Sequence, residues 1–262
     1  MRAIRDDDQV AIDAILRLSR SRRMFAPLAL LVGAFAMLLE GVRLLLTNWR
    51  LTLVQVLPAM WVWLAMYDLK AHVLHGKSFN VVRGPVLIPL NLLIIALTVA
   101  AFFLNAAFAY AITRPPPPAV APAVQEARVN LKPIVAAGTI VGLLLGFATT
   151  VAPRWGKPWF TLTLGIVVGL MMITYVAVPA RLIGVEKATS LSKRDRLAAS
   201  ALGGLLSATV CTPPYLMGRL GLLMIGSSAL LVPGIVLFAV GLTLQAGATG
   251  AVRAIKMSAK LR

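Results

Sequence analysis

Two long uncharged runs, separated by a short basic hinge, constrain this chain more than any other feature. Residues 133–153 and 158–180 contain no charged side chain over 21 and 23 positions respectively. Because an α-helix rises about 1.5 Å per residue, either run can cross a hydrocarbon core of about 30 Å. The hinge at residues 154–157 is short, so we expect the two helices to be antiparallel neighbours in a polytopic membrane protein.

Both runs carry glycines four residues apart. Gly138, Gly142 and Gly146 lie on the first run, and Gly165 and Gly169 lie on the second. At this spacing the glycines share one face of a helix and let the backbone of a partner helix approach closely. The alternative is that they line a permeation path. Close packing is the commoner use of the pattern in lipid, so we predict it for all five positions.

The overall composition indicates which solvent surrounds the chain. Of its 262 residues, 59% are hydrophobic and only 13% are charged, which is typical of a protein embedded in a bilayer. Irregular backbone is costly in lipid, and the apolar runs are continuous rather than alternating. The predicted fold is therefore an all-α transmembrane helical bundle and not a barrel. The single cysteine, Cys211, excludes a disulfide within the chain and is expected to be a small buried hydrophobic residue.

The net charge of +17 could indicate a nucleic-acid partner, but its distribution favours a membrane topology. About six spans with both termini in the cytoplasm place 20 of the 26 Lys and Arg residues inside and six outside, in keeping with the positive-inside rule. The predicted spans are residues 51–67, 84–113, 133–153, 158–180, 197–218 and 220–252. A seventh span at residues 24–39 would make the split 12 to 14, so residues 24–50 are predicted to re-enter or to lie at the interface.

Shorter segments complete the predicted organisation. Residues 1–23 place acidic residues before and arginines after an apolar stripe, which predicts an amphipathic cytoplasmic helix, with a signal peptide as the alternative. Residues 114–132 include four consecutive prolines and predict a stiff cytoplasmic linker, either a spacer or a ligand for a partner, between the first two spans (51–113) and the last four (133–252). Residues 253–262 form a basic cytoplasmic tail.

Prolines and aromatic residues add local expectations. Pro213-Pro214 and Pro233-Gly234 should interrupt the last two runs, either as kinks of packed helices or as broken helices that form an ion or substrate site. Aromatic rings favour the headgroup region, so those at span ends are predicted interface anchors. These anchors are Trp49 at the inner end of the first span, Trp63 and Tyr67 at its outer end, and Trp155 and Trp159 in the hinge.

The entry to the first span resembles that of several bacterial polytopic integral membrane proteins of uncharacterised activity. The shared pattern is a basic residue, a leucine-rich run and an Asn-Trp pair, followed by Leu-Pro; here it reads Gly41-Val42-Arg43-Leu44-Leu45-Leu46-Thr47-Asn48-Trp49-Arg50-Leu51, then Leu57-Pro58-Ala59. The richness in Ala, Arg and Pro is similar to that of actinobacterial proteins. The resemblance covers residues 41–59 and implies a bacterial location, without any catalytic or binding residue.

Asp68, His72 and His75 are the candidate metal ligands. Their spacings of four and three place them on one face of a helical extension of the first span, with Gly76 as a cap. Two imidazoles and a carboxylate could hold Zn²⁺ with an open coordination position, or the histidines could respond to pH. The alternative is a polar span end in which Lys70 neutralises Asp68.

Asn91, Asn105 and Gln245 are the candidate substrate or pore residues. Asn91 and Asn105 are 14 residues apart and so share one helix face, which predicts a polar seam or a pore wall. The commoner role of such side chains is to join helices by hydrogen bonds. None of the nine acidic residues lies inside a predicted span, which disfavours a proton- or cation-coupled carrier.

These features predict a component of the plasma (inner) membrane rather than an enzyme. The chain has no phosphate-binding glycine loop, no Gly-x-Ser-x-Gly and no His-Glu-x-x-His motif. We expect a non-enzymatic accessory or scaffold subunit of a cell-envelope or lipid-handling assembly, without a cofactor or nucleic acid. Its expected partners are anionic headgroups and either another protein or further copies of itself. A small permease or lipid flippase is the alternative, and a zinc-dependent membrane enzyme is the second alternative.

Overall fold

The computed structural model describes residues 38–39, 42–43, 45–73, 84–112, 119–188, 193–225 and 227–248. These residues are helical, without a strand, as the sequence predicts. The α-helices are α3 (Trp49–Val73), α4 (Leu87–Ile112), α5 (Val120–Val129), α6 (Leu131–Thr150), α7 (Lys157–Ala188), α8 (Lys193–Met224) and α9 (Leu231–Ala248). Two short 3-10 turns, η2 (Ala152–Trp155) and η3 (Ser228–Leu230), precede α7 and α9. The predicted N-terminal amphipathic helix, the prolines at 115–118 and the basic tail lie outside the described residues.

Within the described ranges, four helical segments are long and apolar enough to cross a membrane. They are Leu87–Ile112, Leu131–Trp155, Lys157–Ile183 and Ser228–Ala248. The first three coincide closely with the predicted spans at 84–113, 133–153 and 158–180. Helices α3 and α8 are not among the four, so the topology of six spans stays a prediction.

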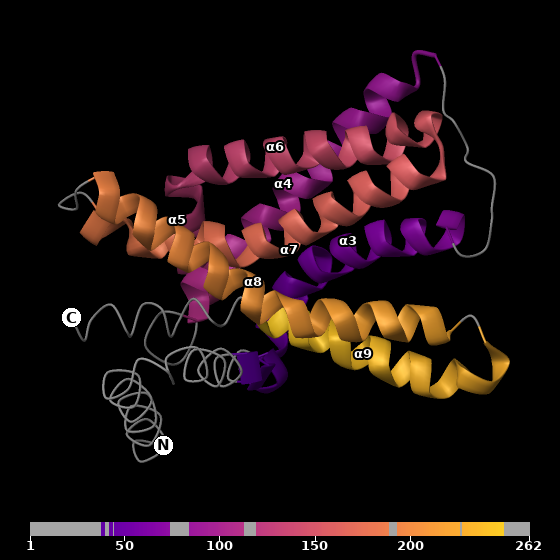
Figure 1. Cartoon of the computed structure of the whole chain (residues 1–262). Coiled ribbons are helices and arrows are strands. Elements are labelled where there is room, and N and C mark those ends of the chain that lie inside the picture. The colour runs from indigo at the N-terminus through magenta and orange to yellow at the C-terminus, as the bar shows by residue number, and fades with distance from the viewer. Residues whose placement is uncertain are drawn as a thin grey trace.

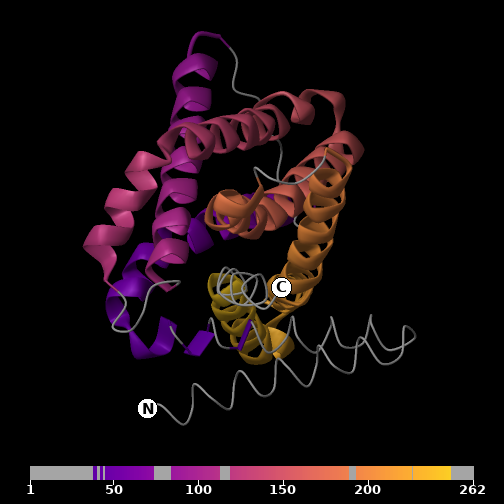
Figure 2. The ribbon, with the colours of Figure 1, turned by 90° about the vertical axis from the view of Figure 1, so that its left-hand side faces the viewer.

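The helices form two closely packed antiparallel pairs, α4 with α6 and α8 with α9 (Figure 1). Helices α3 and α7 connect the pairs, since α3 contacts α4, α7 and α9, and α7 contacts α6 and α8. The two views place the α8–α9 pair on the opposite side of the bundle from α6 (Figure 2). The core between them includes Phe102, Phe160 and Met171, which are almost completely buried.

Glycines on α6 allow it to lie directly against α4. A Cβ atom added to Gly138 would lie 2.8 Å from the Cα of Val99, and one added to Gly142 would lie 2.9 Å from the Cα of Ile95. Gly146 lies against the side chain of Asn91. The three glycines on α6 are thus covered by α4, which comes earlier in the chain, and not by the hairpin partner α7.

The second pair of glycines, Gly165 and Gly169, has surroundings unlike those of the glycines on α6. A Cβ atom added to Gly165 or Gly169 of α7 would meet nothing within 4 Å in the described part of the chain. Neither position is therefore in close contact with a described helix. Close packing at both positions stays a prediction, because the described neighbours of α7 contact another of its faces.

The α8–α9 pair is built on glycines whose role the sequence analysis missed. A Cβ atom at Gly221 would lie 2.5 Å from the backbone nitrogen of Phe238, and one at Gly241 would lie 2.6 Å from the backbone nitrogen of Gly218. The indole ring of Trp63, from α3, lies against Gly218 and meets the Phe238 ring edge-on, with centroids 4.9 Å apart. The absence of side chains on these glycines brings the two backbones together and leaves room for the indole.

The burial of Trp63 corrects its predicted place at the interface. Its side chain is only 4% exposed, whereas Trp49, Trp155 and Trp159 are 68%, 55% and 54% exposed. The latter three remain suited to a headgroup region. Trp63 is instead a core residue, because the α8–α9 pair covers the face of α3 that carries it. The side chain of Tyr67 lies outside the described residues.

The structure also corrects the predicted linker and the last two spans. Residues 120–129 form a helix with Pro122 in its first turn, where the missing N–H is not needed, rather than an extended segment. Helix α8 continues through Pro213-Pro214 and past Arg219 to Met224, so the predicted boundary at residues 218–220 is wrong. Arg219 is exposed and donates to the Tyr215 hydroxyl at 3.2 Å. Arginine is a good helix former, so the charge does not end the helix. Pro233 lies in the first turn of α9 and does not break it.

Candidate functional site

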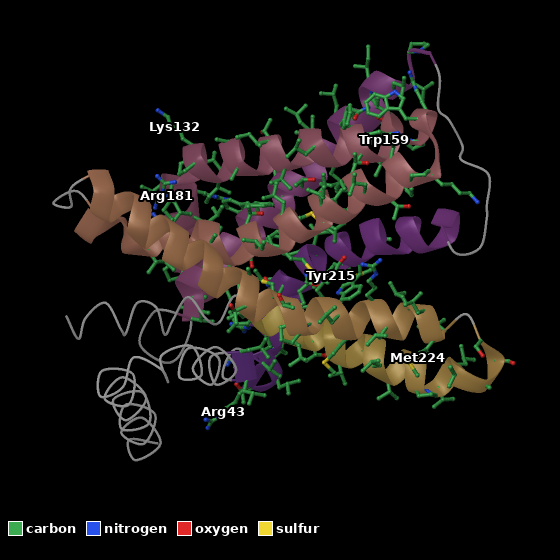
Figure 3. The ribbon with its side chains drawn as sticks, in the orientation of Figure 1. Arg43, Lys132, Trp159, Arg181, Tyr215 and Met224 are labelled. Carbon is green, nitrogen blue, oxygen red and sulfur yellow. The ribbon has the colours of Figure 1, made fainter. Side chains whose placement is uncertain are left out.

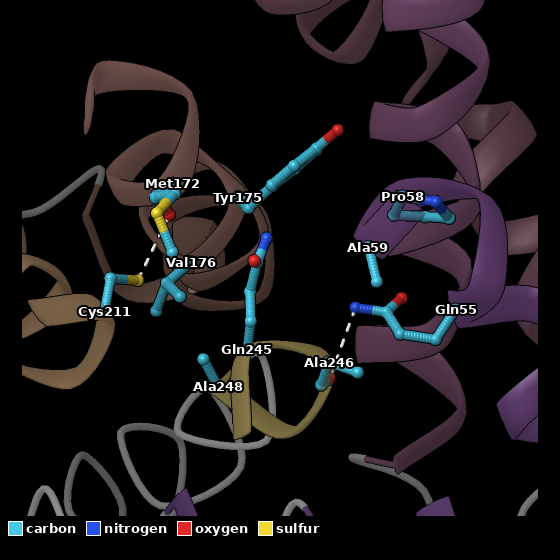
Figure 4. A pocket seen from close by; sticks show the side chains of 10 residues that line it. All are labelled: Gln55, Pro58, Ala59, Met172, Tyr175, Val176, Cys211, Gln245, Ala246 and Ala248. Carbon is cyan, nitrogen blue, oxygen red and sulfur yellow. Dashed lines mark hydrogen bonds between the residues drawn. The ribbon is translucent and has the colours of Figure 1, made fainter. Parts of the chain in front are cut away.

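Polar side chains converge where α3, α7, α8 and α9 meet. Gln55 comes from α3, Tyr175 from α7, Cys211 from α8 and Gln245 from α9, and together they line a small cavity (Figure 4). The centre of a water-sized molecule can occupy about 10 Å³ there. This is close to the minimum space that a single buried water needs. The cavity is therefore a site for a very small molecule.

Gln55 and Asn105 connect four helices at this junction. Gln55 Nε2 donates to Asn105 Oδ1 at 3.0 Å and to the Ala246 carbonyl at 3.3 Å. Asn105 Nδ2 in turn donates to the Tyr175 carbonyl at 2.5 Å. Both amide side chains are buried, at 4% and 1% exposure, so these hydrogen bonds lie away from competing solvent. They join α3, α4, α7 and α9 through one network.

Two residues of the lining, Tyr175 and Gln245, carry a buried polar atom for which the described part of the chain offers no hydrogen-bond partner. Gln245 belongs to α9. Its side chain is 6% exposed and points from α9 toward α7 in Figure 4. Its Oε1 atom finds no hydrogen-bond partner in the described part of the chain. Nearby, Cys211 Sγ donates to the Met172 carbonyl at 3.2 Å, as expected for a buried thiol. A buried carboxamide oxygen without a partner costs free energy, so this atom indicates a place for a small hydrogen-bond donor.

A polar seam follows one face of α4, but its two predicted members lie in different surroundings. Asn91 Nδ2 donates to Thr150 Oγ1 on α6 at 3.3 Å and to the Leu87 carbonyl of its own helix at 2.8 Å. Asn105 faces α3 and α7, as described above. Neither asparagine is among the residues that line the cavity. Asn105 is connected to it only through its hydrogen bond with Gln55. Both asparagines form hydrogen bonds between helices in this structure.

Thr98 completes this seam and was missed by the sequence analysis. It lies midway between the two asparagines, seven residues from each, and its Oγ1 accepts a hydrogen bond from Trp61 Nε1 at 3.0 Å. Extending the seven-residue spacing would have found it. The roles of Gln55 and Tyr175 carry no such local signal, since their partners are 50 and 70 residues away from them in the chain.

The predicted metal site is only partly described. Asp68 and His72 belong to the last turns of α3, which agrees with the predicted helical extension, but their side chains and all of His75 lie outside the described residues. Among the described residues, no group of three or more His, Cys, Asp and Glu side chains is placed to hold a metal ion. The zinc site therefore stays a prediction.

Exposed cations occupy both ends of the bundle. Lys132 on α6 and Arg181 on α7 lie at one end, and Trp159 at the start of α7 marks the other (Figure 3). Arg128, four residues before Lys132, is also exposed. Lys157, the first residue of α7 and close to Trp159 in the chain, is exposed as well. The described part of the chain thus carries positive charge at both ends of the bundle.

Comparison with known proteins assigns no family to these features. No family model, no curated protein and no solved structure matches the chain. A function is therefore argued from the residues and contacts themselves.

Proposed function

We propose that this chain is a non-enzymatic membrane component, an accessory or scaffold subunit of a cell-envelope or lipid-handling assembly in the plasma membrane. The observation that carries this proposal is the network of Gln55, Asn105 and the Tyr175 carbonyl, in which amides buried in the bundle hydrogen-bond helix to helix. Interhelical hydrogen bonds of this kind stabilise a membrane bundle and hold its helices in one arrangement. A fixed helical frame is what a scaffold subunit needs.

The surface of the bundle supports partners in and beside the membrane. Large apolar side chains on α4, α7 and α9 are exposed, Ile88, Ile166 and Val236 among them, and they are suited to lipid or to the helices of a partner. At one end, Arg128, Lys132 and Arg181 provide positive charge for anionic headgroups, worth about 1 kcal/mol per residue near the surface. We assign this end to the cytoplasm from the distribution of Lys and Arg along the chain.

The decisive experiment is purification of the tagged chain in a gentle detergent, followed by mass spectrometry of the proteins and lipids that remain bound. We expect a stoichiometric protein partner and enrichment of anionic lipid. The Arg128→Gln/Lys132→Gln variant should retain less anionic lipid than the wild type. As a matched control, Arg154→Gln/Lys157→Gln removes two charges at the other end and should retain it. A monodisperse chain without a partner that moves a solute in liposomes would overturn the proposal.

A small permease or lipid flippase is the second candidate, and the cavity beside Gln245 favours it. A permeation pathway needs polar groups between helices, and the Gln245 carboxamide oxygen is a buried polar group at a small cavity between four helices. Proteoliposomes can be tested with fluorescent phospholipid for scrambling and with glycerol for uptake. Transport by the wild type that is lost in Gln245→Leu would support the permease, whereas equal, background rates would leave the scaffold as the better account.

A further inference from the structure

The small cavity between α3, α7, α8 and α9 adjoins a buried hydrogen-bond acceptor. Gln245 is more than nine-tenths buried, it lines the cavity, and its Oε1 atom has no partner among the described residues. A buried acceptor of this kind costs about 1–3 kcal/mol unless a donor reaches it. A donor is therefore expected in the space that the carboxamide adjoins.

The size of the cavity selects the donor. About 10 Å³ is open to the centre of a water-sized molecule, which corresponds to roughly one water. The lining contains further polar groups, because the carboxamide of Gln55 enters from α3 and the carbonyls of Met172 and Ala246 lie on α7 and α9. A carbonyl oxygen can accept two hydrogen bonds. The Met172 carbonyl already accepts from Cys211 and from the N–H of Val176 within α7, so the Ala246 carbonyl, which accepts from Gln55, is the candidate for a further donor.

We propose that this cavity binds one water molecule, which donates one hydrogen bond to Gln245 Oε1 and the other to a carbonyl oxygen of the lining. The water lies at the contact between α9 and α3, next to the direct bond from Gln55 to Ala246. Its location has a structural consequence, because α9 meets α3 over a much smaller surface than it shares with α8. The water thus strengthens the attachment of the α8–α9 pair to the rest of the bundle. This inference is independent of the proposed function.

The chain is well suited to a direct test, because it contains only four glutamines, at positions 9, 55, 125 and 245. Selective ¹⁵N labelling of glutamine side chains in the full chain, in deuterated detergent, gives few amide signals. The Gln245 signal is assigned by its disappearance in Gln245→Leu. We expect cross-relaxation between the Gln245 amide protons and a long-lived water, while the exposed Gln125 shows only exchange with bulk solvent.

Thermal unfolding is a second test, because a bound water and an unsatisfied acceptor predict opposite changes in the melting temperature of Gln245→Leu. If a water bridges Gln245 to the lining, Gln245→Leu removes the water together with both of its hydrogen bonds, so the melting temperature should fall by about 2–4 °C. If Oε1 is a lone buried acceptor, leucine relieves its cost and the melting temperature rises. Gln125→Leu is the matched control and should leave it unchanged. Absence of cross-relaxation at Gln245, or a higher melting temperature of Gln245→Leu, overturns the proposal.

Discussion

Replacing Gly138 with alanine should destabilise the bundle, whereas the same replacement at Gly165 should not. Both residues lie inside helices that are long and apolar enough to cross a membrane, and both belong to the same glycine pattern in the sequence. They differ in what a Cβ atom would meet. At Gly138 it would lie 2.8 Å from the Cα of Val99, and at Gly165 it would meet nothing within 4 Å among the described residues. The pair therefore separates helix contact from helix propensity.

The expected magnitude follows from two opposing effects. Alanine in place of glycine favours a helix by up to about 1 kcal/mol, and this gain is common to both sites. At Gly138 the obstructing atom belongs to the backbone of α4, which cannot rotate away, so the helices must separate. Overpacking of this kind costs about 1–3 kcal/mol. The free energy of unfolding of Gly138→Ala should thus be lower than that of Gly165→Ala by about 1–3 kcal/mol.

Reversible unfolding in mixed micelles, with SDS as the denaturant and circular dichroism as the signal, measures this difference. Gly142→Ala should behave like Gly138→Ala, because its Cβ would lie 2.9 Å from the Cα of Ile95. Gly169→Ala should behave like Gly165→Ala. Equal stabilities for Gly138→Ala and Gly165→Ala would refute the close α4–α6 contact on which the reasoning depends.

Two further predictions use the same assay. Asn105→Leu should lower the free energy of unfolding by about 1–2 kcal/mol, since it removes hydrogen bonds to two helices from a buried site. Asn91→Leu should cost less than about 1 kcal/mol, because Asn91 is half-buried and its contact with Thr150 is longer, at 3.3 Å; the reverse order would contradict the assigned roles. Trp63→Ala should cost about 3–5 kcal/mol and speed hydrogen exchange in α8 and α9, because the indole fills the space beside Gly218. Trp49→Ala, at an exposed position, should stay within about 0.5 kcal/mol of the wild type, and a comparable loss in both tryptophan variants would exclude the core position of Trp63.

The class of protein and most of its apolar helices could be predicted from local sequence alone. A segment in lipid must satisfy its backbone hydrogen bonds within itself, so a long uncharged run implies a helix whatever its neighbours are. For this reason the predicted spans at residues 84–113, 133–153 and 158–180 agree with Leu87–Ile112, Leu131–Trp155 and Lys157–Ile183. The sequence also predicts that a partner helix can approach Gly138 and Gly142 closely, because this requires only glycines spaced four residues apart.

The partners of these helices were decided by the tertiary structure. The spacing of glycines indicates that a helix can be approached closely, but not which helix approaches. Here α4 lies on Gly138, whereas no described residue comes within 4 Å of a Cβ atom built at Gly165. From the sequence, a tryptophan near a span end can lie either in the headgroup region or in the core. The folded structure decides the case of Trp63, because α8 and α9 cover it. The link from Gln55 to Asn105 joins residues 50 positions apart, for which periodicity carries no signal. Helix formation depends on each segment and its solvent, whereas the choice of neighbours depends on shapes and polar groups that only meet once the chain is folded.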